Sequence, residues 1–316
     1  MEIFSIFYSL FFSCVTTSKP HIKDHNRPLI HKNDENWIGP QDTDPKLIAD
    51  NSFFNHHESI AVIDDVITES DCEALLNLAN NVVKLGDGYQ GNKAPHNKNE
   101  LFYGATLSEV ADRVNKNEIH ISYLYIYYYL AERVRRQVQA WNNLDHLYQD
   151  YVHLVCRDVV EDIDEKEYQK DIRDWMKSNK ARLTNHMSHP IHSDNCRMLN
   201  NGTCQRERPA YVWREYSAIV YLDDSFTGGD FILADHTGKQ VIANIESKCG
   251  RMATFCAGKE CLHGVKSIRK GRRCALAQWF TLDFSRRDGE HEKVKELLKK
   301  HAEELKGAHG RSHLEL

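Results

Sequence analysis

Short apolar runs separated by turn residues fill the second half of the chain, and this pattern predicts β-strands. Eight runs rich in β-branched and aromatic residues carry it. They are Tyr151–Arg157, His189–Asn195, Tyr216–Leu222, Phe231–Leu233, Val241–Ile245, Arg251–Phe255, Gly264–Ile268 and Cys274–Thr281. Helical periodicity precedes them. This order predicts an α+β fold with a double-stranded β-helix, or jelly-roll, core and supporting N-terminal helices.

Helical patterns lie on both sides of the strand-rich region. A strand expected at Ile60–Val66 leads into Thr68–Asp71, which is typical of a helix N-cap and is followed by periodic apolar positions. His120–Trp141 predicts a helix with one broad apolar face, whose tyrosines belong to the core. The charged segments Asp162–Lys180 and Asp288–Lys306 predict a helical insert and a solvated C-terminal helix.

The two ends of the chain indicate the secretory pathway. Ile3–Val15 is an uncharged apolar run of 13 residues, which is too short to span a membrane and typical of a signal-peptide core. An uncleaved anchor is the alternative, because Glu2 gives the segment before this run the wrong charge. The tail His313–Leu316 reads H-L-E-L and is similar to the K-D-E-L retrieval signal. We therefore expect the protein to reside in the endoplasmic reticulum lumen, without a stable membrane-spanning segment.

Four segments follow from these patterns. We expect a signal peptide over residues 1–18, a polar linker over 19–57, a folded domain over 58–286, and a C-terminal helix with a retrieval-like tail over 287–316. The linker assignment rests on a stretch that is rich in His, Asn and Pro and has no sustained period. The glycine-rich segment Gly86–Gly91 predicts a loop, because it lacks the Lys-Ser/Thr of a phosphate-binding motif.

Composition excludes several classes of protein. Of the 316 residues, 41% are hydrophobic and 28% charged, as in an ordinary folded protein. The 41 Lys and Arg against 46 Asp and Glu give a net charge of −5. Such a chain has no general attraction for phosphate backbones or anionic membranes, so we expect no nucleic-acid partner.

The cysteines suit an oxidising compartment. Nine are present, and Cys14 lies in the predicted signal, which leaves an even number in the mature chain. Cys196 and Cys204 flank a Gly-containing loop and are the preferred disulfide, with buried free thiols as the alternative. The same loop carries a sequon at Asn201, which would be glycosylated in the secretory pathway.

The first candidates for chemistry are His192 and Asp194. Residues i and i+2 of a strand share a face, so this pair can bind one metal ion. His263, at the mouth of a late strand, supplies a third ligand. Two histidines and one carboxylate form the facial triad of non-haem Fe(II) oxygenases. Zinc is the alternative, although the His-Glu-x-x-His motif of a hydrolytic zinc site is absent from the sequence.

Arg273 favours the iron interpretation. It lies at the start of the last apolar strand, where it shares a face with the small residues Ala275 and Ala277. A buried guanidinium needs an anion, and the distal carboxylate of 2-oxoglutarate would pair with it. Tyr221, opposite in the expected strand Ser217–Tyr221, is a candidate second donor to that carboxylate. The alternatives are an Arg273 exposed to water at the strand end and a Tyr221 that is an ordinary core aromatic.

The chain resembles the catalytic domain of the leprecan-type prolyl 3-hydroxylases, the procollagen-proline 3-dioxygenases. The resemblance runs from about Ser59 to Phe284 through ordered motifs. They are Gly86–Gly91, Phe102–Thr106, His153–Arg157, His189–Cys196, Pro209–Tyr211, Glu215–Leu222, Gly228–Phe231, Cys249–Arg251, His263–Lys266 and Trp279–Asp283.

This resemblance implies Fe(II) held by His192, Asp194 and His263, with ascorbate as a further cofactor. It also implies that Arg273 serves catalysis by binding the cosubstrate 2-oxoglutarate. It further implies hydroxylation of prolyl residues in collagen-like polypeptides by residues 58–286. The long members of the family carry a helical-repeat region before the catalytic domain, whereas this chain has only about 40 polar residues there. Cys261-Leu262 and Asp230 also depart from the family's pattern.

Three other interpretations stay open at this point. A dioxygenase could act on C4 of proline or on another residue, because the ligand spacing determines the oxidant and not the bond attacked. A non-catalytic collagen-binding or chaperone module could keep the same scaffold. A zinc hydrolase would bind its metal tetrahedrally. The sequence does not indicate the oligomeric state.

Overall fold

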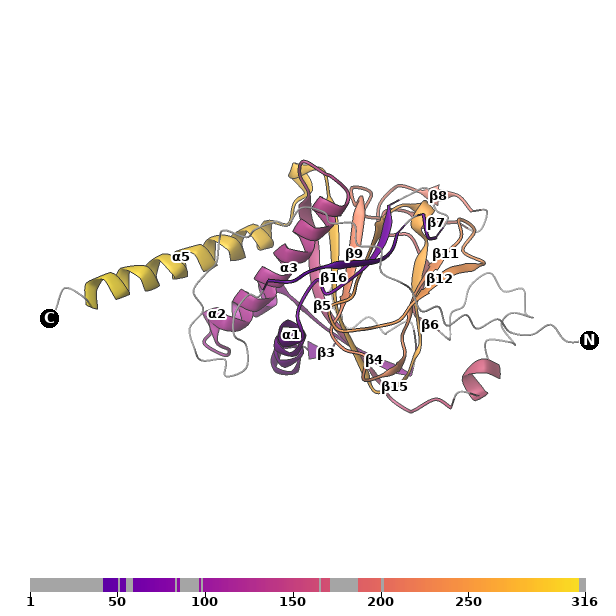
Figure 1. The fold of residues 1–316 in the computed structure, drawn as a ribbon, viewed down its shortest axis with the longest axis horizontal. Coiled ribbons are helices and arrows are strands. Elements are labelled where there is room, and N and C mark those ends of the chain that lie inside the picture. The colour runs from indigo at the N-terminus through magenta and orange to yellow at the C-terminus, as the bar shows by residue number, and fades with distance from the viewer. Residues whose placement is uncertain are drawn as a thin grey trace, which may run out of the picture.

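A large antiparallel sheet forms the centre of the computed structural model (Figure 1). Its eight strands lie in the spatial order β1 (Lys46–Asp50), β2 (Ile60–Asp64), β13 (Met252–Cys256), β9 (Tyr216–Tyr221), β16 (Arg272–Thr281), β5 (Tyr148–Val159), β4 (Glu100–Thr106) and β3 (Lys84–Leu85). The long strand β16 pairs with β9 on one side and with β5 on the other. Every strand pair in this sheet is antiparallel.

The structure describes residues 42–50, 52–54, 59–82, 84–85, 97, 99–164, 166–170, 187–199 and 202–312. Several predicted features lie outside these residues. They are the signal peptide, most of the linker, the loop at Gly86–Gly91, much of the charged insert, the sequon residue Asn201 and the tail His313–Leu316.

A second, smaller sheet lies against the first. It contains β12 (Val241–Ile245), β11 (Phe231–Ala234), β14 (His263–Lys266) and β6 (Met187–His192), in that order. Two short pairs complete the described strands, β10 (Thr227–Gly228) with β15 (Ile268–Lys270) and β7 (Arg197–Met198) with β8 (Cys204–Gln205). Side chains from both sheets, among them Phe231 and Phe255, form a small apolar core between them.

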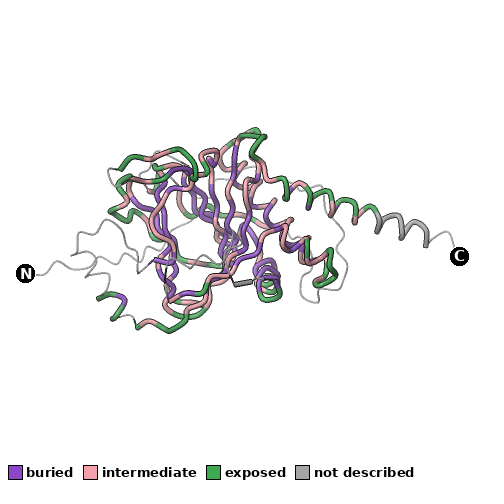
Figure 2. The backbone as a smooth tube through the Cα atoms, turned by 180° about the vertical axis from the view of Figure 1, so that it is seen from behind, coloured by how far each residue is buried: buried purple, intermediate pink, exposed green. Residues whose placement is uncertain are grey.

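The helices cover the opposite face of the large sheet. They are α1 (Glu69–Val82), α2 (Leu107–Asn115), α3 (Ile121–Trp141) and α5 (Gly289–Ser312). Figure 1 shows them on one side of the strands, with α5 projecting away from the body. Their apolar faces and the sheet share the larger core, which includes the fully buried Tyr127. Figure 2 shows buried positions concentrated in the strands and exposed positions in the first half of α5.

Local capping explains where two helices begin. The Thr68 hydroxyl accepts a bond from the Asp71 amide at 3.2 Å, while the Asp71 carboxylate accepts one from the Thr68 amide at 3.0 Å. Thr106 and Glu109 form the same reciprocal arrangement at the start of α2. These bonds satisfy backbone donors that have no partner within the helix, and the N-cap predicted at Thr68–Asp71 is therefore confirmed.

All eight strand runs predicted from the sequence contain strand, and the run at Gly264–Ile268 divides into β14 and β15. The helices at His120–Trp141 and Asp288–Lys306 are confirmed as α3 and α5. One prediction is wrong in part, because β1 lies inside the expected linker and pairs with β2. Ordered structure therefore begins before residue 58. Strand β4 and helix α2 had no predicted counterpart.

The eight cysteines after Cys14 form four disulfides. They are Cys72–Cys249, Cys156–Cys274, Cys196–Cys204 and Cys256–Cys261. The preferred Cys196–Cys204 pair is confirmed. The alternative of buried free thiols is excluded for these residues.

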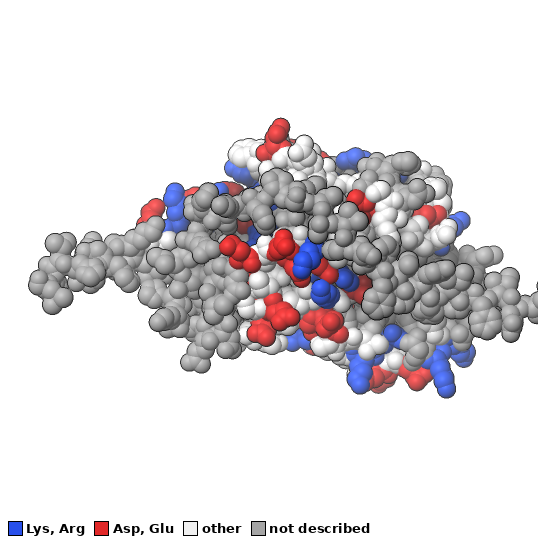
Figure 3. Space-filling view, viewed as in Figure 1, with Lys and Arg blue, Asp and Glu red and all other residues white. Residues whose placement is uncertain are grey.

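Two surface properties bear on partners. No helix within the described residues is long and apolar enough to cross a bilayer. On the face shown in Figure 3, the coloured acidic and basic side chains are interspersed. This mixture agrees with the modest net charge of −5.

Candidate metal centre

A cavity of about 530 Å³ lies between the two sheets. Strands β9 and β16 contribute to it from the large sheet, and β6, β11 and β14 from the small one. His192, Asp194, His263 and Arg273 all line this cavity. Its volume is in the range of sites that bind small organic ligands.

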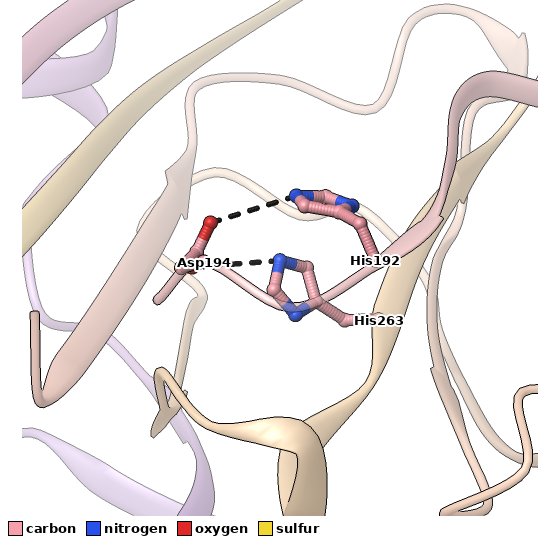
Figure 4. A group of neighbouring side chains, drawn as sticks. All are labelled: His192, Asp194 and His263. Carbon is pink, nitrogen blue, oxygen red and sulfur yellow. Dashed lines mark ion pairs between the residues drawn. The ribbon is translucent and has the colours of Figure 1, made fainter. Parts of the chain in front are cut away.

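Three of the predicted residues meet at one end of a strand pair. His192 ends β6 and His263 begins β14, and antiparallel pairing sets the two residues opposite each other. The Nε2 atoms of His192 and His263 lie 3.5 and 3.6 Å from Oδ1 and Oδ2 of Asp194 (Figure 4). Each of the three residues offers one potential ligand atom, and these three atoms lie within 4.8 Å of one another.

The route by which Asp194 reaches the histidines differs from the prediction. Asp194 lies in a bend after β6 and is not part of the strand, so the expected shared strand face is wrong. Its amide donates to the Ala257 carbonyl at 3.1 Å, which holds the bend against the loop after β13. The carboxylate therefore turns back toward both imidazoles.

Backbone carbonyls set the tautomers of both imidazoles. Nδ1 of His192 lies 2.8 Å from the Pro190 carbonyl oxygen, and Nδ1 of His263 lies 2.9 Å from that of Cys261. A carbonyl only accepts, so each Nδ1 carries the proton and donates it. Each Nε2 then keeps a lone pair directed at Asp194, which is the arrangement that metal-ligating histidines require.

Electrostatics keep these groups in metal-binding protonation states. Burial lowers the pKa of His263 to about 4, because a charged imidazole would lose its hydration. Burial opposes ionisation of Asp194, but the neighbouring His263 and His192 outweigh it and hold its pKa well below the usual value. The Ser217 hydroxyl donates to Asp194 Oδ2 at 2.5 Å. A neutral imidazole and an ionised carboxylate result.

Arg273 lies in the same cavity and is only 3% exposed. Its Nε and Nη2 have no hydrogen-bond partner within the described residues, and neither does the hydroxyl of the fully buried Tyr221. The guanidinium carbon lies 5.2 Å from the centroid of the Tyr221 ring. Burial raises the pKa of Tyr221 to about 12, so its hydroxyl keeps its proton as a donor. The alternative of a water-exposed Arg273 is wrong.

A glycine makes room for the Arg273 side chain. Gly229 has a φ of +72°, and a Cβ at this position would lie 2.8 Å from Cδ of Arg273. A side chain here would be strained and would press on the arginine. The unpaired donors and the space around them therefore fit an anionic group that enters the cavity.

Comparisons with known proteins agree with this chemistry. Residues 179–281 match the model of the 2OG-Fe(II) oxygenase superfamily. Prolyl 3-hydroxylase 2 of Mus musculus is 37% identical over 251 residues, which cover 79% of this chain and 33% of that protein. Prolyl 3-hydroxylase 1 of Homo sapiens is 38% identical over 241 residues, which cover 75% of this chain and 30% of that protein.

Residues 179–281 are thus similar to the 2OG-Fe(II) oxygenase superfamily, and a longer part of the chain is similar to the leprecan-type prolyl 3-hydroxylases. The chain spans about one third of the length of the curated relatives that it matches. A solved 2OG-Fe(II) oxygenase from Burkholderia pseudomallei aligns with a TM-score of 0.41 at 10% identity, covering 70% of this chain and 85% of that chain. The superfamily implies Fe(II) and 2-oxoglutarate, and ascorbate is typical of prolyl hydroxylases.

The cavity has a further wall that the sequence did not reveal. The Arg214 guanidinium carbon lies 3.9 Å from the Tyr211 ring centroid and 4.7 Å from that of Trp279. Its Nε donates to Asp150 at 2.6 Å. Tyr211, Arg214 and Trp279 all line the cavity. The alternation that linked Arg273 to Ala275 and Ala277 also extends to Trp279, but no sequence pattern pointed to Asp150.

Proposed function

We propose that this chain is an Fe(II)/2-oxoglutarate-dependent dioxygenase that hydroxylates prolyl residues at C3 in collagen-like polypeptides. One observation carries the proposal. A His-Asp-His cluster lines the same cavity as a buried arginine, two of whose donors have no hydrogen-bond partner in the described part of the chain. This combination fits a divalent metal ion bound together with a dicarboxylate. The mechanism of a zinc hydrolase does not require the buried arginine.

His192, Asp194 and His263 would hold the metal ion. Their Nε2 lone pairs and the ionised carboxylate are available, while both Nδ1 protons stay bound to backbone carbonyls. A metal ion held by only these three protein ligands would keep coordination positions for cosubstrate and oxygen. Bound Fe(II) and 2-oxoglutarate supply the oxidative chemistry, in which dioxygen is activated to hydroxylate a C–H bond. The protein supplies position, protonation state and exclusion of water.

Arg273 would bind the distal carboxylate of 2-oxoglutarate. Its two unpaired donors, Nε and Nη2, fit a bidentate contact with a carboxylate. The protonated Tyr221 hydroxyl would donate a further hydrogen bond. Binding of 2-oxoglutarate would also stabilise the protein, because a buried guanidinium without an anionic partner is destabilising.

The polypeptide substrate would reach the cavity along the wall of Tyr211, Arg214 and Trp279. Aromatic surfaces suit an extended, proline-rich chain, whose rings offer apolar faces and whose polyproline conformation is already ordered. The sequence identity with prolyl 3-hydroxylases 1 and 2 supports collagen-like chains as the substrate class.

Three further assignments belong to this proposal. The facing sheets are proposed to be the double-stranded β-helix, or jelly-roll, core of the oxygenase domain, which extends from β1 to about residue 286. The endoplasmic reticulum lumen is the proposed compartment, with four disulfides and the H-L-E-L tail as support. Residues 1–18 and Asn201 are the proposed signal peptide and glycosylation site.

A turnover assay on collagen-like peptides tests the function. Purified protein is supplied with Fe(II), 2-oxoglutarate, ascorbate and oxygen, and both succinate and the position of the added oxygen are measured. We expect succinate release coupled to 3-hydroxyproline. His263→Ala should abolish both, whereas His236→Ala, at an exposed turn, should leave both unchanged.

Each competing function predicts a different result of this assay. Oxygen at C4 of proline, or on another residue, would keep the dioxygenase and reject the proposed bond. Peptide binding without succinate release would support the non-catalytic module. Peptide cleavage that needs no oxygen and is retained with zinc would support the hydrolase.

A further inference from the structure

The loop that joins β13 to β14 connects the two sheets beside the metal centre. Cys256 ends β13 in the large sheet, and His263 begins β14 in the small one. A disulfide links Cys256 to Cys261 within this loop, across a separation of five residues. The loop is anchored to the large sheet by the amides of Cys256 and Ala257, which donate to the carbonyls of Ser59 and Glu215 at 3.0 and 2.8 Å.

One carbonyl of the loop holds the bend that carries Asp194. The Ala257 carbonyl accepts three hydrogen bonds, from the Ser193 hydroxyl at 3.0 Å and from the Asp194 and Asn195 amides at 3.1 Å each. Ala257 directly follows Cys256 and is fully buried. A shift of this carbonyl would therefore move the carboxylate ligand.

A second carbonyl of the same loop orients His263. The Cys261 carbonyl accepts the Nδ1 proton of His263 at 2.9 Å. Cys261 is 1% exposed. It also ends the short 3₁₀ turn Lys259–Cys261, where its amide donates to the Gly258 carbonyl at 3.1 Å. The loop thus contacts two of the three candidate ligands through backbone atoms at or beside its disulfide-bonded cysteines.

Loop length argues that this disulfide acts locally. A disulfide stabilises a fold mainly by restricting the unfolded chain, and the effect grows with the number of residues enclosed. Cys72–Cys249 and Cys156–Cys274 span 177 and 118 residues, whereas Cys256–Cys261 spans five. The short bridge restricts the unfolded chain least of these three, but it limits how far the two carbonyls can move apart.

We propose that Cys256 and Cys261 are positioning residues for the metal centre, because their disulfide fixes the loop whose carbonyls hold Asp194 and His263. The inference rests on the proposed function, since it concerns the metal which that function requires. According to this proposal, the disulfide is a covalent constraint on the position of the metal ligands, in addition to their hydrogen bonds. Mutation of groups that hydrogen-bond to metal ligands, as these two carbonyls do, typically lowers metal affinity by 10- to 100-fold.

The test compares two disulfide deletions. C256A/C261A removes the loop bridge, and C72A/C249A removes the long bridge between α1 and the turn before β13. Anaerobic calorimetric titration with Fe(II) alone gives each dissociation constant, at a temperature well below the unfolding midpoint of each metal-free protein. We expect a rise of at least about tenfold for C256A/C261A, and little change for C72A/C249A despite its larger loss of thermal stability.

A second measurement covers the case in which C256A/C261A does not fold. Wild-type protein loaded with Fe(II) is treated with increasing dithiothreitol, and the freed thiols are alkylated and located by mass spectrometry. Each reduction transfers two electrons and two protons from the dithiol, which gives two cysteine thiols and cyclic oxidised reagent. We expect metal release to follow alkylation of Cys256 and Cys261.

The outcomes separate this inference from the proposed function. Fe(II) binding that is tight in wild type and equally tight in C256A/C261A would overturn the positioning role and leave the function standing. Metal release that follows reduction of Cys72–Cys249 alone would do the same. A wild-type protein that binds no Fe(II) would overturn both.

Discussion

The two faces of the eight-stranded sheet are built for different purposes. On the helix face, Leu276 and Phe280 of β16 pack into a continuous apolar core with α3. On the cavity face, Arg273 and Ala275 of the same strand line an open space of about 530 Å³. Side chains alternate along β16, so that those on one face stabilise the fold and those on the other face line the ligand cavity.

This difference shows how the fold keeps reactive groups available. On the helix face, burial of apolar side chains stabilises the fold. The cavity face instead holds the donors of Arg273 and the hydroxyl of Tyr221 without partners in the described residues. Unpaired buried groups lower stability, so the apolar core on the other face has to offset them. Substitutions on the two faces should accordingly separate activity from stability.

The largest effect is expected for Asp194→Asn on the cavity face. Loss of the carboxylate should lower turnover by a thousandfold or more, about 4 kcal/mol of activation free energy. Anaerobic titration should show a matching loss of Fe(II) affinity. A variant that keeps full turnover would contradict the assignment of Asp194 as a ligand.

Leu130→Ala should have the opposite profile. Leu130 is fully buried in the helix-face core, so its truncation should lower the unfolding free energy by about 2–5 kcal/mol. The ratio kcat/KM should stay within about twofold of wild type at temperatures well below unfolding. The matched control is Leu101→Ala at a 41% exposed position, which should change stability by less than about 0.5 kcal/mol. Urea denaturation measures both.

Arg273→Met should weaken 2-oxoglutarate binding without weakening the fold. We expect at least a tenfold rise in the cosubstrate dissociation constant, about 1.4 kcal/mol, because the paired carboxylate loses both donors. Stability without ligand should be unchanged or higher.

Arg272→Met is the control for this experiment. Arg272 is the preceding residue on the strand, points to the other face and pairs with Asp158 at 3.2 Å. Its loss should leave 2-oxoglutarate affinity unchanged. Equal weakening by both substitutions would show that general positive charge, and not the position of Arg273, attracts the cosubstrate.

The smallest effect concerns the docking of α5. Glu132 of α3 accepts hydrogen bonds from His291 and Arg135, each at 2.9 Å. Burial opposes its ionisation, but these partners outweigh burial and hold its pKa well below 4.5. Its stabilising contribution is therefore complete at neutral pH and is lost as the pH falls below the unfolded-state value.

Glu132→Gln should accordingly lower the unfolding free energy by about 1–2 kcal/mol at pH 7, and the difference from wild type should shrink below about pH 4.5. Urea titrations at several pH values measure this. Turnover should not change. Glu290→Gln, in an exposed pair with Lys293, should leave the pH profile of stability nearly unaltered.

Much of the secondary structure could be predicted because it depends on local patterns. Alternating apolar positions identified the core strands, and the capping pattern at Thr68–Asp71 identified the start of α1. Strand β1 was missed because it lies within a polar stretch that has no sustained period, and the sequence did not show its pairing with β2. Pairing with another segment leaves no signal within the five residues of the strand itself.

The candidate site also has features that could be predicted from the sequence and others that could not. The chemistry of His192, Asp194, His263 and Arg273 could be inferred from residue type and strand context. The sequence could not show that Asp194 leaves the strand and is held by the Ala257 carbonyl, because hydrogen bonds between loops depend on how the loops meet. The wall of Arg214 and its aromatic partners was missed for the same reason.

The sequence by itself determined the reactive groups, the apolar alternation that sorts residues between two faces, and an even number of cysteines after the predicted signal. Only the tertiary structure decided how the other six cysteines pair and how the ligands converge. It also showed that two donors of the buried guanidinium have no hydrogen-bond partner among the described residues. These properties depend on contacts between residues far apart in the chain. Local propensity acts over a few residues, whereas such contacts exist only once the two sheets have packed together.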